Sequence, residues 1–286
     1  MIPTTAGQLI ERYQVLLIDA YGVLITHDGV LPGAGELIAH LSSANKPFFI
    51  VTNDASRSVE RSAERYRGLG LSIAAEQIIT SGLLLRRHFA DHGLIGARCV
   101  VLGPDDSLEY VRSAGGEIVD LDSTEDAEAV IICDERGFDV MPSLDRVLSM
   151  LFRRADDGQS TALIVPNPDL IYPADTGRFG FTAGALAVMF EEALAQRYPD
   201  RDDLRFVRLG KPHRAIFEEA RRRAGTDDLV MIGDQLATDI LGAARYGIDS
   251  ALVTTGLTRV GADGLPAAGY PADAQATYLL RSLRVE

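Results

Sequence analysis

The stretch that decides the fold is Val15-Leu16-Leu17-Ile18-Asp19-Ala20-Tyr21-Gly22. Four consecutive apolar residues are too few for a helix face but suit a strand buried on both sides, as in the middle of a parallel sheet. The run stops at Asp19, and Gly22 lets the backbone turn away sharply. An isolated Asp after a strand most often caps a turn. A central strand of an open α/β sheet, however, would place Asp19 at the edge where ligands bind.

The composition limits the classes of protein to which the chain can belong. It has 286 residues, of which 47% are hydrophobic, enough for the cores of two domains. The formal net charge of −13 disfavours binding to a nucleic-acid backbone. Cys99 and Cys133 lie in apolar runs without metal-ligand spacing, as expected for reduced thiols. With neither a leader pattern nor a membrane-length apolar run, we expect a cytoplasmic protein that binds neither nucleic acid nor membranes.

Strand and helix patterns alternate in the first part of the chain. Apolar runs at 15–18 and 47–51 predict strands, 78–82 predicts a third short strand and its turn, and the segments 36–43 and 56–69 predict the helices between them. Leu9, Ile10 and Tyr13 share one face of a short amphipathic lead-in. This order is typical of a doubly wound parallel sheet.

A second alternation of strands and helices then begins. Its predicted elements cover 98–103, 106–114, 129–133, 144–154 and 162–165. Predicted strands that end in polar, potentially catalytic residues occur before this alternation and again only after it. We therefore predict a second α/β unit, 84–183, inserted into a domain formed by 1–83 and 184–286. The elements predicted for the returning chain are 183–197, 206–209, 216–224, 229–232 and 250–253, the last clear strand, followed by a surface loop over 261–274.

Polar residues follow four of the predicted strands. They are Asp19, the pair Thr52 and Asn53, Lys211, and Asp234 with Asp239. Because parallel strands bring their carboxyl ends to one edge, we expect these residues to share a site. Carboxylates hold Mg²⁺ together with waters and a phosphate, a lysine neutralises phosphoryl oxygens, and an ionised Asp can act as a nucleophile without a base. The set points to phosphoryl transfer.

These motifs resemble, in order, the four motifs of the haloacid dehalogenase superfamily. They read Asp19-Ala-Tyr-Gly-Val-Leu, Val51-Thr52-Asn53, Gly210-Lys211-Pro212, and Gly233-Asp234 through Thr238-Asp239. Asn167-Pro168-Asp169, Gly184-Ala185-Leu186 and the stretch 242–256 resemble the NagD-like branch, subfamily IIA. The resemblance spans nearly the whole chain. It implies a Rossmann-like core with an inserted α/β cap domain that sets substrate specificity.

The resemblance also implies an activity and assigns roles. The expected enzyme is a Mg²⁺-dependent phosphatase that hydrolyses a small phosphorylated metabolite, such as a sugar, nucleotide or cofactor phosphate, through an aspartyl-phosphate on Asp19. The implied metal ligands are Asp19, Asp234 and the backbone carbonyl of Tyr21. The residues implied to bind the phosphoryl group are Thr52, Asn53 and Lys211. Asp239 is implied to orient the metal-bound waters or Lys211. Pairing of two copies through the cap is implied as well.

The role of two cap residues stays open. Asn167 and Asp169 follow a predicted cap strand, so they are candidates for contact with the substrate. An Asx-Pro turn that stabilises the cap explains the same residues equally well. His213 lies beside Lys211, but a surface histidine is the more common case.

One position departs from the family pattern. Tyr21 stands where these phosphatases usually carry an Asp that protonates the leaving oxygen, help that is worth ~10²–10⁴-fold in rate. A metal ligand that is a backbone carbonyl survives this change. Three outcomes follow: substrates with good leaving groups, another acid such as Asp28, Asp54 or Asp169, or a phosphate-binding module with little turnover. A phosphotransferase that passes the phosphoryl group to an alcohol is a further alternative.

Overall fold

The computed structural model describes residues 1–120, 127–175, 177–254, 256, 258 and 271–285. The chain divides into two compact units. Unit 1 comprises Met1–Thr52, Val59–Ile79 and Lys211–Glu286, and unit 2 comprises Asn53–Ser58 and Thr80–Gly210. Each is an α/β structure around its own parallel sheet, which confirms the predicted fold class.

Unit 1 is built on a seven-stranded sheet. In spatial order its strands are β1 (Ile2–Thr4), β16 (Tyr278–Leu280), β15 (Asp249–Val253), β14 (Leu229–Gly233), β2 (Val15–Ile18), β5 (Phe48–Thr52) and β6 (Ile78–Thr80). The decisive apolar run forms β2, and all four of its residues are buried. β14, β2 and β5 pair in parallel, so their carboxyl ends lie at one edge.

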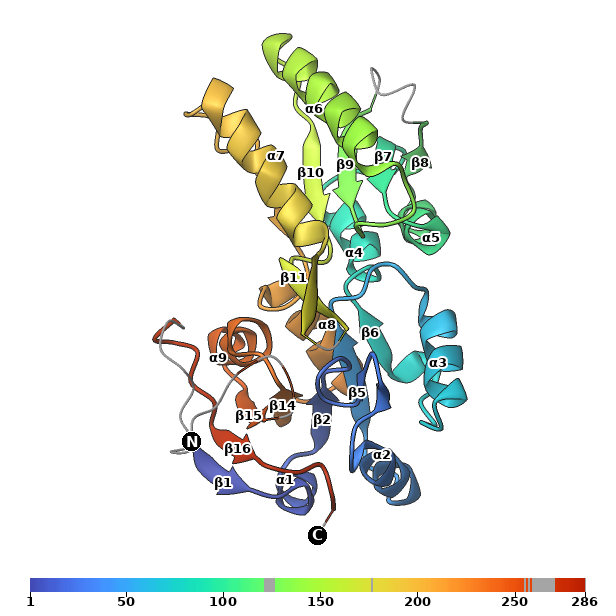
Figure 1. Cartoon of the computed structure of the whole chain (residues 1–286), viewed down its shortest axis with the longest axis vertical. Coiled ribbons are helices and arrows are strands. Elements are labelled where there is room, and N and C mark those ends of the chain that lie inside the picture. Colours follow the sequence, from blue (N-terminus) through green and yellow to red (C-terminus); the bar gives the residue numbers. More distant parts are fainter. Residues whose placement is uncertain (121–126, 176, 255, 257, 259–270, 286) are drawn as a thin grey trace. The chain divides into compact units, whose positions relative to one another are not determined.

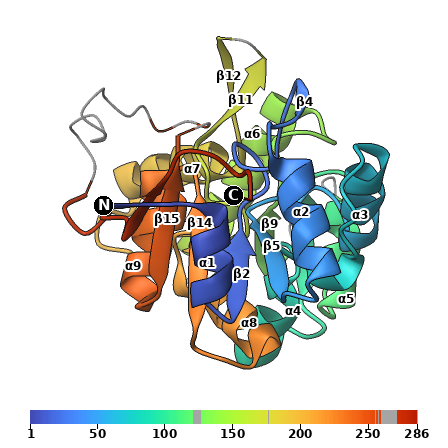
Figure 2. The ribbon, with the colours of Figure 1, turned by 90° about the horizontal axis from the view of Figure 1, so that it is seen from below.

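Helices cover both faces of this sheet. Leu16 and Ile18 of β2 pack in one apolar cluster with α1 (Ala6–Arg12), α2 (Ala34–Ser43) and α3 (Val59–Gly68). On β15, Leu252 points to the opposite face and packs with Leu241 of α9 (Leu241–Tyr246). α8 (Arg214–Ala224) packs beside α9, and Figure 2 shows α1 in front of β2. Unit 1 is therefore a doubly wound sheet, as the alternation predicts.

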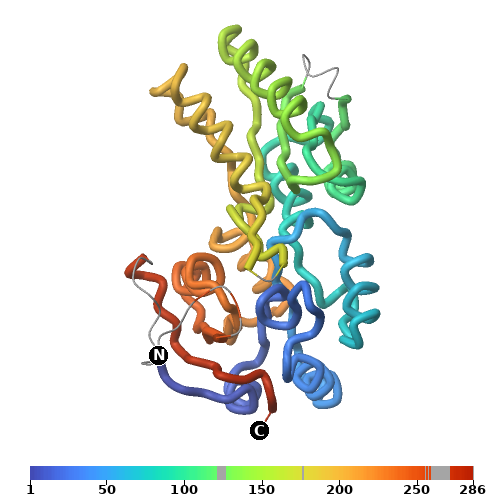
Figure 3. Tube along the Cα trace, viewed as in Figure 1, coloured from blue at the N-terminus to red at the C-terminus, as the bar shows by residue number. Residues whose placement is uncertain are grey.

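The sheet of unit 1 grows in two directions from its centre. The chain runs from β2 to β5 and β6 on one side, whereas β14, β15 and β16 extend the other side. This reversal puts a topological switch point between β2 and β14, where open α/β sheets bind ligands beyond the carboxyl ends of the strands. β1 and β16 pair at the far edge, so the two ends of the chain run side by side, blue against red in Figure 3.

Unit 2 has a five-stranded sheet. Its order is β13 (Val207–Arg208), β10 (Ala162–Val165), β9 (Ala129–Ile132), β7 (Arg98–Leu102) and β8 (Glu117–Ile118), and every neighbouring pair is parallel. α6 (Val140–Asp156) and α7 (Ala183–Arg197) cover one face (Figure 1). α5 (Asp105–Ser113) packs against β7 and beside α4 (Leu84–Asp91). A hairpin of β11 (Ile171–Asp175) and β12 (Arg178–Phe181) precedes α7.

The boundaries of the units differ from the predicted domains. The helix 183–197 has its predicted bounds, but it belongs to unit 2 because Leu186, Phe190 and Leu194 pack against strands β9 and β10. β13 also pairs with β10, so unit 2 extends to Gly210 and not to 183. Helical periodicity gives the length of a helix but not the sheet that it covers.

Several short elements were not predicted. They include β1, β8, β16, α4, the β11–β12 hairpin and a hairpin of β3 (Ile25–Thr26) and β4 (Gly29–Val30). Because β16 follows β15, 250–253 is not the last strand. Residues 261–270 of the predicted surface loop lie outside the described residues. In the part of the chain that the structure describes, no helix combines the length and the apolar character needed to span a bilayer.

Candidate active site

Asp19 lies directly beyond β2, at the switch point. Its backbone N–H donates to the carbonyl of Ile232 in β14 (2.9 Å), which ties the residue to the neighbouring strand. The N–H of Ala20 donates to Asp19 Oδ1 (2.7 Å), and the side chain is buried. Gly22 adopts a positive φ of 90°, which favours glycine and turns the chain away from the sheet. The predicted position of Asp19 is confirmed.

Lys211 contacts three segments of unit 1: the ends of β2 and β5 and the turn after β14. It is 3% exposed, and its Nζ lies 2.6 Å from Asp19 Oδ1 and 2.7 Å from Asp239 Oδ1. The ammonium also donates to the carbonyl oxygen of Val51 in β5 (3.0 Å). These contacts hold the cation in one place. The sequence predicted that Lys211 and Asp19 share a site, but a backbone acceptor such as Val51 carries no signal in its residue type.

Asp234 and Asp239 complete this cluster from β14 and the turn after it. Asp234 directly follows the strand, and Asp239 lies in a π-helical turn, η3 (Leu236–Ile240). Asp239 Oδ2 accepts the N–H of Gln235 (3.1 Å), while its other oxygen faces Lys211. Oxygen atoms of Asp19, Asp234 and Asp239 all lie within 4.8 Å of one another, and all three residues are buried. The structure therefore brings the three predicted carboxylates together.

Three glycines make room for the carboxylates. A Cβ atom at Gly233 would overlap the side chain of Asp239. A Cβ at Gly22 or at Gly256 would overlap the carboxylate of Asp234. The Asp234 side chain thus packs directly against the backbone at positions 22 and 256. A residue larger than glycine at either position would overlap it.

Among the described residues of the cluster, two buried carboxylates share one ammonium group. Asp19 and Asp239 both pair with Lys211, an oxygen of Asp234 lies within 4.8 Å of theirs, and burial of charge is costly unless it is paired. Burial raises the pKa of Asp19 to about 7; Asp239 adds to this rise and Lys211 opposes it. Burial by itself lowers the pKa of the Lys211 ammonium. The nearby charges of Asp19 and Asp239 have a larger effect, so the pKa is raised overall. A divalent cation fits this donor set, because hard carboxylate oxygens would hold it and it would offset the excess charge.

Two family models match the chain. A model described as haloacid dehalogenase-like hydrolase matches residues 16–117, and a second, HAD-hydrolase-like model matches 208–284. Together they cover more than half of the sequence and include every residue of the carboxylate cluster. The chain belongs to the haloacid dehalogenase-like hydrolases. Its inserted unit and its relatives place it in their NagD-like branch.

Named relatives of this hydrolase cover most of its length. A crystal structure of a possible sugar phosphatase from Cytophaga hutchinsonii is 30% identical, with a TM-score of 0.80 over 100% of this chain and 99% of that one. Human glycerol-3-phosphate phosphatase is 29% identical over 88% of this chain and 84% of its own. The 5'-nucleotidase YutF of Bacillus subtilis is 24% identical over 87% of this chain and 90% of its own.

The other predicted residues of unit 1 flank the cluster in the sequence. Thr52 is the last residue of β5 and is half-buried. Tyr21 is also half-buried, and it packs against the apolar cluster of unit 1 and forms a β-bridge with Ile25. The Tyr21 ring is thus part of the packing of the hydrolase core, whereas its backbone carbonyl stays a predicted metal ligand. His213 directly precedes α8 and is half-buried.

The remaining predicted residues belong to unit 2 and contact one another. Asn53 Nδ2 donates to Asp169 Oδ1 (2.9 Å). Asn167 Oδ1 accepts the N–H of Asp169 (3.1 Å), and its Nδ2 donates to Thr182 Oγ1 (3.0 Å). The Asx turn considered for Asn167 is therefore present. Contact of Asn167 or Asp169 with a substrate stays a prediction.

The two other carboxylates considered as replacement acids have contacts of their own. Asp28 is 76% exposed at its side chain and lies 3.0 Å from His27 Nε2. Asp54 Oδ1 accepts from both the N–H and the Oγ of Ser56 (2.7 Å each), and its Oδ2 accepts from Arg57 Nη1 (3.1 Å). Asp54 therefore closes a local turn.

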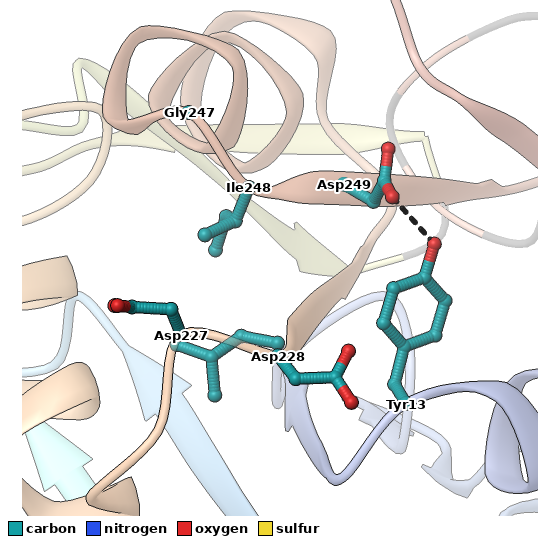
Figure 4. Close-up of a pocket in the computed structure, with 7 residues that line it drawn as sticks. Tyr13, Asp227, Asp228, Gly247, Ile248 and Asp249 are labelled. Carbon is teal, nitrogen blue, oxygen red and sulfur yellow. Dashed lines mark hydrogen bonds between the residues drawn. The ribbon is translucent and has the colours of Figure 1, made fainter.

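A pocket of about 310 Å³ lies at the other edge of the unit 1 sheet, before the first residues of β2, β14 and β15. Figure 4 shows Tyr13 donating to Asp249, a bond of 2.6 Å. Asp249 also accepts from Thr277 (2.8 Å), and Asp228 accepts the N–H of Gln14 (3.1 Å). Asp228 and Asp249 therefore hold strand ends in place, and the pocket is distinct from the Asp19 cluster.

Proposed function

We propose that this hydrolase is a Mg²⁺-dependent phosphatase that acts on a small phosphate ester through an aspartyl-phosphate on Asp19. The observation that carries the proposal is the buried cluster at the switch point, in which Asp19 lies 2.6 Å from Lys211 Nζ and within 4.8 Å of oxygens of Asp234 and Asp239. The names of the three relatives, which refer to sugar, glycerol and nucleotide phosphates, support a small ester.

In the first step, a carboxylate oxygen of Asp19 attacks phosphorus. The new P–O bond forms as the ester P–O bond breaks, and the leaving oxygen keeps the electron pair of that bond. Lys211 stabilises the ionised form of Asp19 and the charge on the phosphoryl oxygens. Thr52 and Asn53 donate hydrogen bonds to the same oxygens.

In the second step, water attacks phosphorus and the bond to Asp19 breaks, so the carboxylate is regenerated and phosphate leaves. Asp19, Asp234 and the backbone carbonyl of Tyr21 would hold Mg²⁺, with Asp239 orienting Lys211. When bound, the ion supplies charge neutralisation of the phosphoryl oxygens.

The packing of Tyr21 supports a preference for good leaving groups. Its ring lies against the apolar cluster of unit 1, and Asp28 and Asp54 have local partners. An aryl, acyl or anomeric phosphate needs little protonation of its leaving oxygen, so it is hydrolysed without the missing acid.

The test is phosphate release with Mg²⁺ from aryl, acyl and alkyl phosphates, beside Asp19→Asn and a chelated sample. We expect turnover that needs both Asp19 and the metal and that falls steeply as the leaving group worsens. Equal rates for aryl and alkyl esters would contradict the leaving-group preference. An added alcohol that raises substrate consumption but not free phosphate would identify a phosphotransferase instead. No release from any ester, with phosphate still bound, would indicate a binding module.

A further inference from the structure

The segment 53–58 follows β5 directly, yet it is packed as part of unit 2. Side chains of unit 2 hold its backbone: Ser81 Oγ donates to the carbonyl of Asn53 (2.7 Å), Ser107 Oγ to that of Ala55 (2.8 Å) and Tyr110 OH to that of Arg57 (2.6 Å), and Asp106 Oδ2 accepts the N–H of Ser58 (2.9 Å). Three of these four anchors come from α5. The loop that carries Asn53 is therefore fixed by the inserted unit.

The side chain of Asn53 is fixed in the same way. Thr182, which caps the N-terminus of α7, accepts from Asn167 Nδ2 (3.0 Å). Asn167 Oδ1 accepts the N–H of Asp169 (3.1 Å), and Asp169 Oδ1 accepts from Asn53 Nδ2 (2.9 Å). The relay runs from the start of a helix of unit 2 to an amide that is 5% exposed. Gly184 completes it, because a Cβ there would overlap the carbonyls of Pro168 and Asp169.

We propose that Asp169 is a positioning residue that sets the orientation of the Asn53 carboxamide. In this proposal the turn Asn167-Pro168-Asp169 holds Asp169 where its carboxylate can accept from Asn53. A carboxylate only accepts hydrogen bonds, so the nitrogen end of the amide is held toward Asp169. Without this partner nothing at position 169 selects the nitrogen end, and the amide oxygen can take the place of the nitrogen there. A carbonyl oxygen repels a phosphoryl oxygen, so affinity for phosphate falls. The proposal rests on the proposed function for the role of Asn53.

This role differs from direct contact between Asp169 and the substrate, and the two can be separated. A residue that acts only through Asn53 loses its effect once Asn53 is replaced. A residue with its own contact keeps its effect. A double-mutant cycle measures this difference.

The cycle consists of Asp169→Ala, Asn53→Ala and the double variant, with affinity for inorganic phosphate measured by calorimetry in Mg²⁺. We expect each single variant to weaken binding by about tenfold, as for the loss of one hydrogen bond to a charged group. The double variant should bind no more weakly than Asn53→Ala alone, whereas independent contacts would combine to about a hundredfold.

Two further variants separate positioning from general damage. Asp169→Asn keeps an acceptor oxygen, so we expect it to stay within about threefold of the wild type. Asp145→Ala makes the same truncation at an exposed residue of α6 in the same unit and should leave binding unchanged. The urea midpoint of each variant reports folding. In NMR spectra, the Asn53 side-chain amide signal should move in Asp169→Ala and stay near its wild-type position in Asp169→Asn.

The outcomes distinguish this proposal from the proposed function. Multiplicative weakening in the double variant would overturn it in favour of a direct contact, even in an active phosphatase. Loss of stability in Asp169→Ala with unchanged phosphate affinity would leave Asp169 a structural role only. A protein that binds phosphate with the expected cycle but releases none from any ester would overturn the proposed function and not this proposal. A wild type that binds no phosphate would overturn both.

Discussion

Asp19 of unit 1 and Asp134 of unit 2 occupy similar places and have different partners. Each is a buried carboxylate just beyond an inner strand of a parallel sheet, β2 and β9 respectively. Asp134 Oδ1 accepts from the N–H and the Nε of Arg136, two residues on (3.0 and 3.1 Å). Asp19 instead faces Lys211, which comes from a distant part of the chain, and shares it with Asp239.

This difference shows what separates a turn from a site. Asp134 is satisfied by its own turn and by an Arg136 side chain that is 60% exposed, so solvent stabilises the pair. In the Asp19 cluster the lysine is 3% exposed, Asp19 and Asp239 share it, and an oxygen of Asp234 lies within 4.8 Å of theirs. A buried acid whose charge is balanced locally supports the fold, whereas one left with excess negative charge can receive a cation or attack an electrophile.

The largest expected effect comes from neutralising each acid in turn. Asp19→Asn should lower phosphate release by ~10⁴-fold or more, because it removes the nucleophile. Asp134→Asn should keep turnover within about threefold and cost ~1 kcal/mol of stability, since a charged hydrogen bond is weakened. Steady-state rates and urea midpoints of both variants test this. Similar rates in the two variants would remove the contrast.

The next largest difference is expected in the contributions of Lys211 and Arg136 to stability. Lys211→Met leaves the buried carboxylates of Asp19 and Asp239 without their ammonium, and we expect the free energy of unfolding to fall by ~3–5 kcal/mol in metal-free buffer. Arg136→Met should cost no more than ~1 kcal/mol, because its pair with Asp134 is open to solvent. Urea titrations of both variants measure the two costs. Comparable losses would show that burial does not distinguish the pairs.

Stabilisation by magnesium is expected to depend on Asp234 of unit 1 and not on Asp134 of unit 2. At a hundred times its dissociation constant, Mg²⁺ is expected to raise the free energy of unfolding by ~2.7 kcal/mol, and a chelator should reverse this gain. Asp234→Asn should abolish the rise, whereas Asp134→Asn should retain it. Thermal unfolding with and without the ion gives the answer; a shift that survives in Asp234→Asn would place the ion elsewhere.

The smallest expected effect concerns His88, a half-buried base of unit 2. Burial, aided by His92, lowers the pKa of His88 in α4 from 6.5 to about 4. The unfolded chain therefore binds this proton first, and the contribution of His88 to stability is lost as the pH falls from 6.5 toward 4. In His88→Gln the decline of the urea midpoint over this window should be shallower, while the midpoint above pH 7 serves as the reference. An identical slope would contradict the assignment.

Much of unit 1 could be predicted from the sequence, because its signals are local. The apolar run from Val15 to Ile18 predicts a buried strand. The polar residues that follow the strands predict the edge of the sheet at which Asp19 and Lys211 meet. The role of Lys211 as a clamp between strands could not be predicted, since the Val51 carbonyl looks the same in every sequence.

Unit 2 was harder to predict because its contacts are not local. The helix 183–197 follows from periodicity, but the choice of β9 and β10 as its partner does not. The residues 53–58 look like a continuation of unit 1, and only their bonds to Ser107 and Tyr110 assign them to unit 2. The Asn53 to Asp169 contact joins residues 116 positions apart, a distance over which spacing gives no information.

The glycines at 22, 233 and 256 give relatives of this hydrolase a way to lose function that no inventory of ionisable groups would reveal. Each marks a point where one added methyl group overlaps Asp234 or Asp239. A relative with every acid and the lysine in place, but with alanine at the position of Gly256, would keep its net charge and its motifs while its carboxylate is displaced. Surveys that rank related sequences by the presence of catalytic acids should therefore check these three positions as well.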